Sequence, residues 1–178
     1  WNSSHTCSRC NCNSSINMND NKLALHMPKP QKAIKAFRKG NNCAQSVLSV
    51  YADELQFDKD LSMEIASGFG AGMGRLQETC GAVTGAFMVI GLYNSNKYKN
   101  VAEGKEASIK MIQDFNEQFV KLHASNKCRD ILKCDLKTIE GQKYYISNKL
   151  PEKVCEKCIA SAVEIIEKMR TSDEESTN

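Results

Sequence analysis

The chain has 178 residues, which fits a single domain with a core of its own. Its formal net charge is only +3, and no lysine and arginine stripe alternates with aromatic residues, so nothing indicates binding to nucleic acid. The hydrophobic share is 41%, and no apolar run approaches the roughly 18 residues of a membrane-spanning helix, so we predict no membrane span.

Residues 1–26 are rich in asparagine and serine and lack apolar periodicity, so we expect a disordered polar tail. Pro28 and Pro30 mark the entry to the folded part, which we expect to be one domain over residues 27–170. Apolar residues at a spacing of three to four then predict helices. The expected ranges are about 31–39, 43–55, 80–92, 101–122, 128–133 and 152–169.

Asp58 or Asp60 is expected to cap a further helix that runs through Ala66. Residues 138–150 lack apolar periodicity, which indicates a loop. The acidic end, residues 171–178, is expected to be a disordered tail.

No stretch alternates apolar and polar residues at a period of two, so we predict no strand. Short polar turns separate helices that each carry one apolar face, which predicts an all-α fold, a single-domain helical bundle. The strongly apolar helix from Cys80 is expected to be the buried central helix and to end before a polar turn at residues 94–96. In the next helix we expect these side chains to point inward: Ile109, Ile112, Phe115, Phe119 and Leu122.

A glycine-dense segment, residues 68–74, precedes the apolar helix, and we expect it to form a loop. It does not match a phosphate-binding loop, because an Arg-Leu pair stands where such a loop ends in Gly-Lys-Ser/Thr. Either the segment is flexible, or its backbone passes close to a bulky prosthetic group. The second interpretation makes Gly70, Gly72 and Gly81 cofactor-binding residues. Close packing on a neighbouring helix also explains Gly81 and Gly85, which lie four residues apart.

The cysteines are the most informative residues, and four of the nine lie where we expect helices to begin: Cys43, Cys80, Cys128 and Cys155. A helix N-terminus presents unpaired N–H groups and a partial positive charge, which lower the pKa of a thiol. Each cysteine alone could be a small buried hydrophobe. Four placed alike favour metal ligation or redox chemistry.

Further cysteines complicate this set. Cys155 and Cys158 form a Cys-x-x-Cys pair whose sulfurs lie on nearly one helix face, and Cys134 follows Cys128 by six residues, so Cys134 and Cys158 are alternate ligands. A loosely binding, metal-sequestering pattern lies in the tail at Cys7, Cys10 and Cys12. No histidine follows either Cys-x-x-Cys pair, so we expect no c-type haem.

His123 is the only histidine of the expected domain, and at a helix end it is more often a partner of the helix dipole than a ligand. No arrangement typical of hydrolytic enzymes is visible. The abundance of cysteine without an export signal favours a reducing compartment, and we expect the cytoplasm. A removed leader is also compatible with a chain that begins at Trp1.

Three segments carry a family resemblance: Asn42-Cys43-Ala44-Gln45-Ser46, Gly68-Phe69-Gly70-Ala71-Gly72-Met73 and Cys80-Gly81-Ala82-Val83-Thr84-Gly85. In these the chain resembles a bacterial family of redox-active proteins named for its cysteine pattern, C_GCAxxG_C_C, whose later cysteines match Cys128 and Cys155. The resemblance covers about residues 30–170 and implies an all-helical fold. That family is similar to part of the split-Soret cytochromes, where a related helical region is associated with a cysteine-bound iron–sulfur centre. The haem motifs of those cytochromes are missing here.

Our first hypothesis is an iron–sulfur cluster, [2Fe–2S] or [4Fe–4S], held by Cys43, Cys80, Cys128 and Cys155. The protein would be an electron carrier or redox sensor with a redox partner protein, rather than a substrate-converting enzyme. One alternative is metal-free thiol–disulfide exchange, by Cys155 with Cys158 or by Cys80 with Cys43. Another is a structural zinc site. The small glycine and alanine faces are compatible with a homo-oligomer.

Overall fold

The structure is a computed structural model that describes residues 27–175, and these residues form an all-α fold as predicted. No strand occurs within this range, where Thr79 and Lys127 form only an isolated antiparallel bridge. The expected tail at residues 1–26 lies outside the described residues. In chain order the elements are α2 (Lys29–Arg38), α3 (Cys43–Ser49), α4 (Ala52–Leu55), α5 (Lys59–Ala66), η1 (Ser67–Phe69), α6 (Gly70–Met73), α7 (Gly81–Lys97), α8 (Val101–His123), α9 (Cys128–Leu132), α10 (Ile139–Ser147), η2 (Pro151–Cys155) and α11 (Glu156–Glu175).

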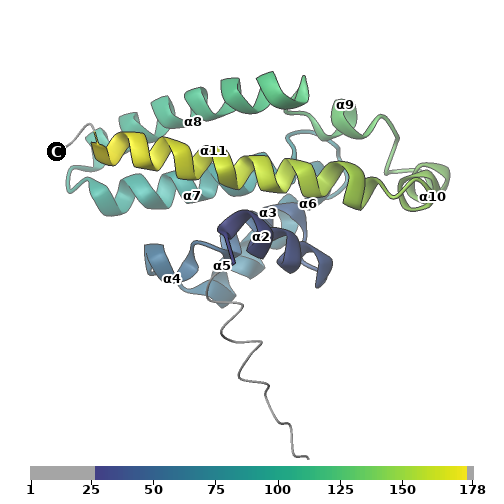
Figure 1. Cartoon of the computed structure of the whole chain (residues 1–178), viewed down its shortest axis with the longest axis horizontal. Coiled ribbons are helices and arrows are strands. Elements are labelled where there is room, and N and C mark those ends of the chain that lie inside the picture. The colour runs from purple at the N-terminus through teal and green to yellow at the C-terminus, as the bar shows by residue number, and fades with distance from the viewer. Residues whose placement is uncertain (1–26, 176–178) are drawn as a thin grey trace, which may run out of the picture.

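The three long helices α7, α8 and α11 pack against one another and form one half of the molecule (Figure 1). The short helices α2 to α6 lie along one side of this group, where α2 packs on α11 and α3 packs on α7 (Figure 1). Helices α9 and α10 lie together at one end (Figure 1). None of the helices described between residues 27 and 175 combines the length and the apolar character needed to cross a membrane.

Side-chain caps explain where several helices begin. The Asn42 side chain accepts a hydrogen bond from the Gln45 backbone at 3.0 Å, and the Gln45 side chain accepts one from the Asn42 backbone at 2.9 Å. This reciprocal capping box satisfies two donors at the start of α3. Asp58 caps α5 by accepting from the Leu61 backbone. The expected single helix over residues 43–55 is instead two helices, because α3 ends at Ser49 and α4 begins at Ala52.

Helix α7 extends past its predicted end and stops at Lys97. The expected polar turn at residues 94–96 is wrong because Asn94 is satisfied inside the helix: its Nδ2 donates to the Ile90 carbonyl at 3.1 Å. The packing explanation for Gly85 is confirmed, since a Cβ there would meet the Ala44 carbonyl oxygen at 2.7 Å. The glycine therefore lets α7 and α3 approach closely.

Helix α8 has the predicted bounds within a residue, but its buried face differs from the expectation. Met111, Phe115 and Phe119 are its large buried side chains, a stripe at a spacing of four. Ile109 is 40% exposed and Leu122 is 63% exposed, so neither points inward as expected. The apolar residues of α8 occupy a wider face of the helix than α7 and α11 bury.

Residues 138–150 do not form the expected loop, because α10 occupies most of them. The Thr138 side chain caps this helix by accepting from the Gly141 backbone at 3.0 Å. Ile139 and Ile146 are each 66% exposed, and Gly141 is the only buried residue of α10. A helix with so little buried surface has no apolar periodicity to reveal it.

The last helix also continues beyond its expected end, so residues 171–175 are helical rather than part of a disordered acidic tail. Asp173 accepts hydrogen bonds from Lys97 Nζ at 2.6 Å and from the Tyr93 hydroxyl at 2.8 Å. These contacts tie the end of α11 to α7.

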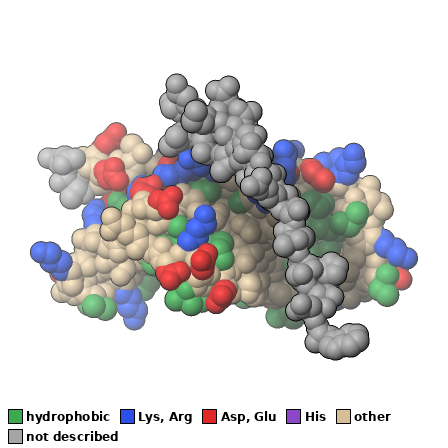
Figure 2. Space-filling view, turned by 90° about the horizontal axis from the view of Figure 1, so that it is seen from below, with side chains coloured by type: hydrophobic (Ala, Val, Ile, Leu, Met, Phe, Trp, Pro, Cys, Tyr) green, Lys and Arg blue, Asp and Glu red, His purple; other side chains and the backbone are tan. Residues whose placement is uncertain are grey.

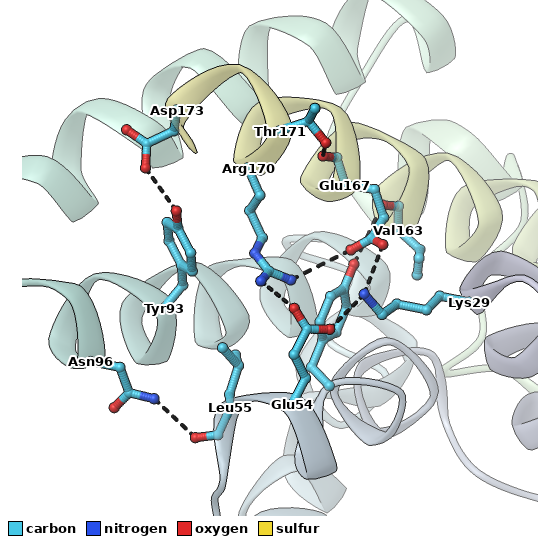
Figure 3. Close-up of polar contacts among 11 residues, drawn as sticks. Lys29, Glu54, Leu55, Tyr93, Asn96, Val163, Glu167, Arg170, Thr171 and Asp173 are labelled. Atoms are coloured by element: carbon cyan, nitrogen blue, oxygen red, sulfur yellow. Dashed lines mark hydrogen bonds and ion pairs between the residues drawn. The ribbon is translucent and has the colours of Figure 1, made fainter. Parts of the chain in front are cut away.

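Four charged residues, which we call the charged cluster, join α2, α4 and α11: Lys29, Glu54, Glu167 and Arg170 (Figure 3). Lys29 Nζ lies 2.6 Å from a Glu54 oxygen and 2.7 Å from a Glu167 oxygen, and Arg170 pairs with Glu54. Both cations also lie over the ring of buried Tyr51. On the face of the molecule seen in Figure 2, acidic and basic side chains are interspersed.

Candidate functional site

A cavity of about 150 Å³ lies at the N-terminal end of α11, and its lining is mostly apolar side chains and sulfur. Five cysteines line it: Cys43, Cys80, Cys128, Cys155 and Cys158. The structure therefore brings together the four cysteines predicted as ligands, together with one of the two alternates. The other alternate, Cys134, is half-buried and lies outside the lining.

The starts of helical segments position the four predicted ligands. Cys43 is the first residue of α3, Cys128 is the first residue of α9, and Cys80 is the cap residue before α7. Cys155 ends the π-helical turn η2, which leads directly into α11. Three helix N-termini and one helix junction therefore converge on the cavity.

Backbone hydrogen bonds hold two of these cysteines side by side. The Cys80 N–H donates to the Asn126 carbonyl at 2.8 Å, and the Cys128 N–H donates to the Glu78 carbonyl at 2.7 Å. The isolated bridge of the fold lies between these bonds. Because backbone atoms make the contact, the relative position of Cys80 and Cys128 does not depend on their side chains.

The predicted cofactor-binding glycines allow close approach to residues at or next to the cavity cysteines. A Cβ on Gly72 would lie 2.7 Å from the Cβ of Cys128, and a Cβ on Gly81 would lie 3.0 Å from the Cβ of Cys43. A Cβ on Gly70 would lie 2.5 Å from the Cβ of Asn42, which precedes Cys43. Gly81 also lines the cavity, whereas Gly70 and Gly72 lie outside the lining.

The glycine-dense segment contains a left-handed turn at the edge of the cavity. Residues 71–75 all have positive φ, between 53° and 67°. Three of them are not glycine, and each such residue costs about 1–2 kcal/mol. Buried Gln77 braces the turn: its Nε2 donates to the Cys134 carbonyl at 2.7 Å and its Oε1 accepts from the Leu136 backbone at 2.9 Å. Strain of this kind is typical of functional sites.

All six cysteines of the described range are free of disulfides, and the thiols influence one another's pKa values in two pairs. The hydrogen bond between Cys43 and Cys155 raises the pKa of Cys43 and lowers that of Cys155. The bond between Cys80 and Cys158 lowers the pKa of Cys80, which backbone N–H groups at the start of α7 lower further, and raises the pKa of Cys158. Burial raises the pKa of Cys128 to about 12. In each pair, one thiol therefore has a pKa below the ordinary value and the other a pKa above it.

Two residues near the thiols were missed as site residues. The Tyr145 hydroxyl lies 3.4 Å from Cys155 Sγ, and burial raises the pKa of Tyr145, so the hydroxyl stays protonated and can donate to a thiolate sulfur. Tyr145 lies on α10, in the stretch expected to be a loop, and the cap Thr138 is the one sequence signal that marks this helix.

The second residue, His123, ends α8, where its Nδ1 lies 3.8 Å from Cys158 Sγ. Its ring packs on Phe119, with 4.5 Å between the ring centroids. Its Nε2 is buried and has no hydrogen-bond partner among the described residues. Burial lowers the pKa of His123, so the neutral ring predominates at neutral pH.

The thiols that line the cavity do not form a ready-made site for one metal ion. Within residues 27–175, no three His, Cys, Asp or Glu side chains are arranged to hold one metal ion. The ligands of an iron–sulfur cluster need not converge on one ion, because they bind different irons. The cavity volume of about 150 Å³ is also roughly ten times what one water molecule requires.

Neither a curated protein nor a solved structure matches the chain. Residues 41–169 match a protein family, and this stretch contains all six cysteines of the described part, including the five that line the cavity. The match covers well over half of the chain. The chain therefore belongs to the family described as "Putative redox-active protein (C_GCAxxG_C_C)".

Proposed function

We propose that this protein holds an iron–sulfur cluster in the cysteine-lined cavity and acts in electron transfer or redox sensing. One observation carries the proposal: four free thiols from four separate segments line the same cavity. Four cysteine thiolates are the usual ligand set of such clusters. The description of the family as redox-active supports the same class of function.

In this proposal Cys43, Cys80, Cys128 and Cys155 bind iron, and the bound cluster supplies one-electron chemistry. The other lining residues are mainly apolar and exclude water, and low solvent access is one determinant of a cluster's potential. Tyr145 adds a hydrogen bond to the Cys155 sulfur. Cys158 remains the alternate ligand, because it lines the same cavity.

A metal-free thiol–disulfide protein is the second candidate, and the paired thiols favour it. The thiols that influence each other's pKa most are Cys43 with Cys155 and Cys80 with Cys158, whereas the sequence analysis named Cys155 with Cys158 or Cys80 with Cys43. Closing one disulfide removes two electrons and two protons from a thiol pair and delivers them to an oxidant such as another disulfide. A structural zinc site has less support, since it needs four ligands around one ion, and the described residues contain no such group.

Anaerobic purification followed by iron, sulfide and visible-absorption measurements tests the cluster. We expect iron and acid-labile sulfide in similar amounts and a broad visible absorption that dithionite bleaches. Serine substitutions at Cys43, Cys80, Cys128 and Cys155 should each remove most of the iron. Cys134→Ser is the matched control and should keep it, because Cys134 lies outside the cavity. A colourless, iron-free protein from this preparation would overturn the proposal.

Thiol counting separates the two candidates. The second candidate predicts that metal-free protein loses two or four reactive thiols on mild oxidation and regains them with a reductant. Peptide mapping should then find disulfides between Cys43 and Cys155 or between Cys80 and Cys158. If the metal-free protein forms neither disulfide, the second candidate is wrong.

A further inference from the structure

A second pocket, of about 550 Å³, opens beside the cysteine cavity where the end of α8 meets α9 and the start of α11. Three lysines line it: Lys133 follows α9, Lys153 lies in η2 and Lys157 lies in α11. We call this pocket the lysine groove. Lys153 and Lys157 lie about one turn apart along η2 and α11, and tertiary packing brings Lys133 to them.

The lysine groove carries a net positive charge. All three lysines are exposed, and none of them forms an ion pair with a described residue. Asp130 is the one acidic residue of the lining, and it accepts a hydrogen bond from the Ser125 hydroxyl. By contrast, charges of both signs are interspersed on the face seen in Figure 2.

The lining also offers apolar surface to a partner. Leu122 is 63% exposed and Ile131 and Val154 are partly exposed, so apolar side chains lie among the lysines. Weak electron-transfer complexes are small and have a polar, charge-complementary rim around an apolar contact. A small anion would instead need a closed cradle of donors. The open groove therefore fits a protein surface better.

Short contacts connect the lysine groove to the cysteine cavity. Ile131 lines both of them. His123 lines the groove, and its Nδ1 lies 3.8 Å from the sulfur of Cys158, which lines the cavity. A partner seated in the groove is thus separated from the thiols by a single layer of side chains, and electron transfer is fastest over short distances.

We propose that the lysine groove is the docking surface for an acidic one-electron carrier protein. The carrier would pass its electron past His123 to the proposed iron–sulfur cluster, which we call the centre. The inference rests on the proposed function. One electron leaves the reduced carrier, which is oxidised by one electron, and the centre is reduced by one electron. No covalent bond forms or breaks.

The test uses flavodoxin, an acidic flavin carrier, as the probe, chemically reduced and mixed anaerobically with the cluster-containing protein. The groove variant combines Lys133→Glu, Lys153→Glu and Lys157→Glu. The matched control combines Lys32→Glu, Lys59→Glu and Lys105→Glu, which change the same charge at exposed positions elsewhere. We expect the second-order rate at low salt to fall about tenfold or more for the groove variant and about threefold or less for the control. Equal slowing of the two variants overturns the inference.

Reduction by dithionite at high salt distinguishes failure of the docking inference from failure of the proposed function, because a small reductant needs no docking surface. If dithionite reduces all three proteins but flavodoxin reduces both variants equally fast, the docking inference fails and the proposed function stands. If dithionite reduces none of them, the proposed function itself fails. Inorganic phosphate that abolishes the flavodoxin reaction at submillimolar concentration and constant ionic strength would assign the groove to small anions and also overturn the inference. The single variant Lys157→Glu should slow the reaction in the same direction by a smaller factor.

Discussion

Helix α11 begins beside the five cysteines of the cavity and approaches its other end among the charged cluster, and different interactions stabilise the two regions (Figure 1, Figure 3). At the charged cluster, Lys29 and Arg170 each pair with acidic side chains from other elements or from α11 itself. At the cavity the groups are apolar side chains and thiols, and two of the sulfurs contact Tyr145 and His123.

The difference indicates which region serves function. The charged cluster balances its own charges and links α2, α4 and α11, as a structural element does. The cavity region instead combines open volume, buried thiols and a left-handed turn at residues 71–75. None of these three features stabilises the fold by itself. These are the features on which our proposal of a bound group depends.

The largest expected effect concerns the tight packing behind the cavity. Gly72→Ala should lower the free energy of unfolding by about 3 kcal/mol, because the added Cβ would lie 2.7 Å from the Cβ of Cys128 at a φ of +67°. The matched control is Gly74→Ala, which has a φ of +62° but nothing within 4 Å of the added Cβ. It should cost only about 1 kcal/mol. Urea unfolding measures both, and equal losses would show that packing against Cys128 does not matter.

The charged cluster should respond next most strongly. Arg170→Met should lower the free energy of unfolding by about 2 kcal/mol, because the Arg170 side chain is only 11% exposed and its loss leaves Glu54 and Glu167 with a single cation. The control Lys105→Met removes the same charge from an exposed position and should cost less than about 0.5 kcal/mol. Similar values for the two variants would contradict a structural role for the cluster.

A smaller effect is expected at the cavity from Tyr145→Phe, which removes the hydrogen bond to Cys155 Sγ. One such bond is worth about 1 kcal/mol, which corresponds to about 40 mV in a one-electron potential. The hydrogen bond stabilises the reduced form of the proposed cluster, which carries one more negative charge than the oxidised form. Loss of the bond in Tyr145→Phe should therefore make the reduction potential more negative. The control Tyr144→Phe, at a neighbouring position that is 52% exposed, should leave the potential unchanged. A redox titration compares the two, and a shift in the control alone would exclude this role for Tyr145.

The smallest effect concerns acid pH. Partial burial alone raises the pKa of Glu54, but hydrogen bonds from Arg170 and Lys29 outweigh it and lower the pKa overall. The stability from this carboxylate is therefore present above the unfolded pKa of about 4.3 and is lost as the pH falls through the lower folded value. Between pH 7 and pH 3, the wild type should lose about 0.5 kcal/mol more stability than Glu54→Gln, after allowance for solvent screening. Parallel pH profiles of the two proteins would argue against this linkage.

Local interactions explain which features could be predicted from the sequence. The starts of α3 and α5 depend on Asn42 and Asp58, which lie next to the helices they cap. The bounds of α8 follow from a long apolar repeat. Helix α10 was missed because its apolar side chains face solvent, and the end of α7 was missed because Asn94 bonds to its own helix.

The sequence by itself determined the all-α class and the placement of Cys43, Cys80, Cys128 and Cys155 at or beside helix starts, because caps and apolar periodicity act over only a few residues. Tertiary structure alone decided which thiols influence one another, how Tyr145 and His123 reach them, and that Lys133 lies near Lys153 and Lys157 beside the cavity. The residues of each thiol pair are more than seventy positions apart in the chain. Contacts between residues so far apart in the chain depend on how whole helices pack. The residues of one helix face do not indicate which other helix that face will contact.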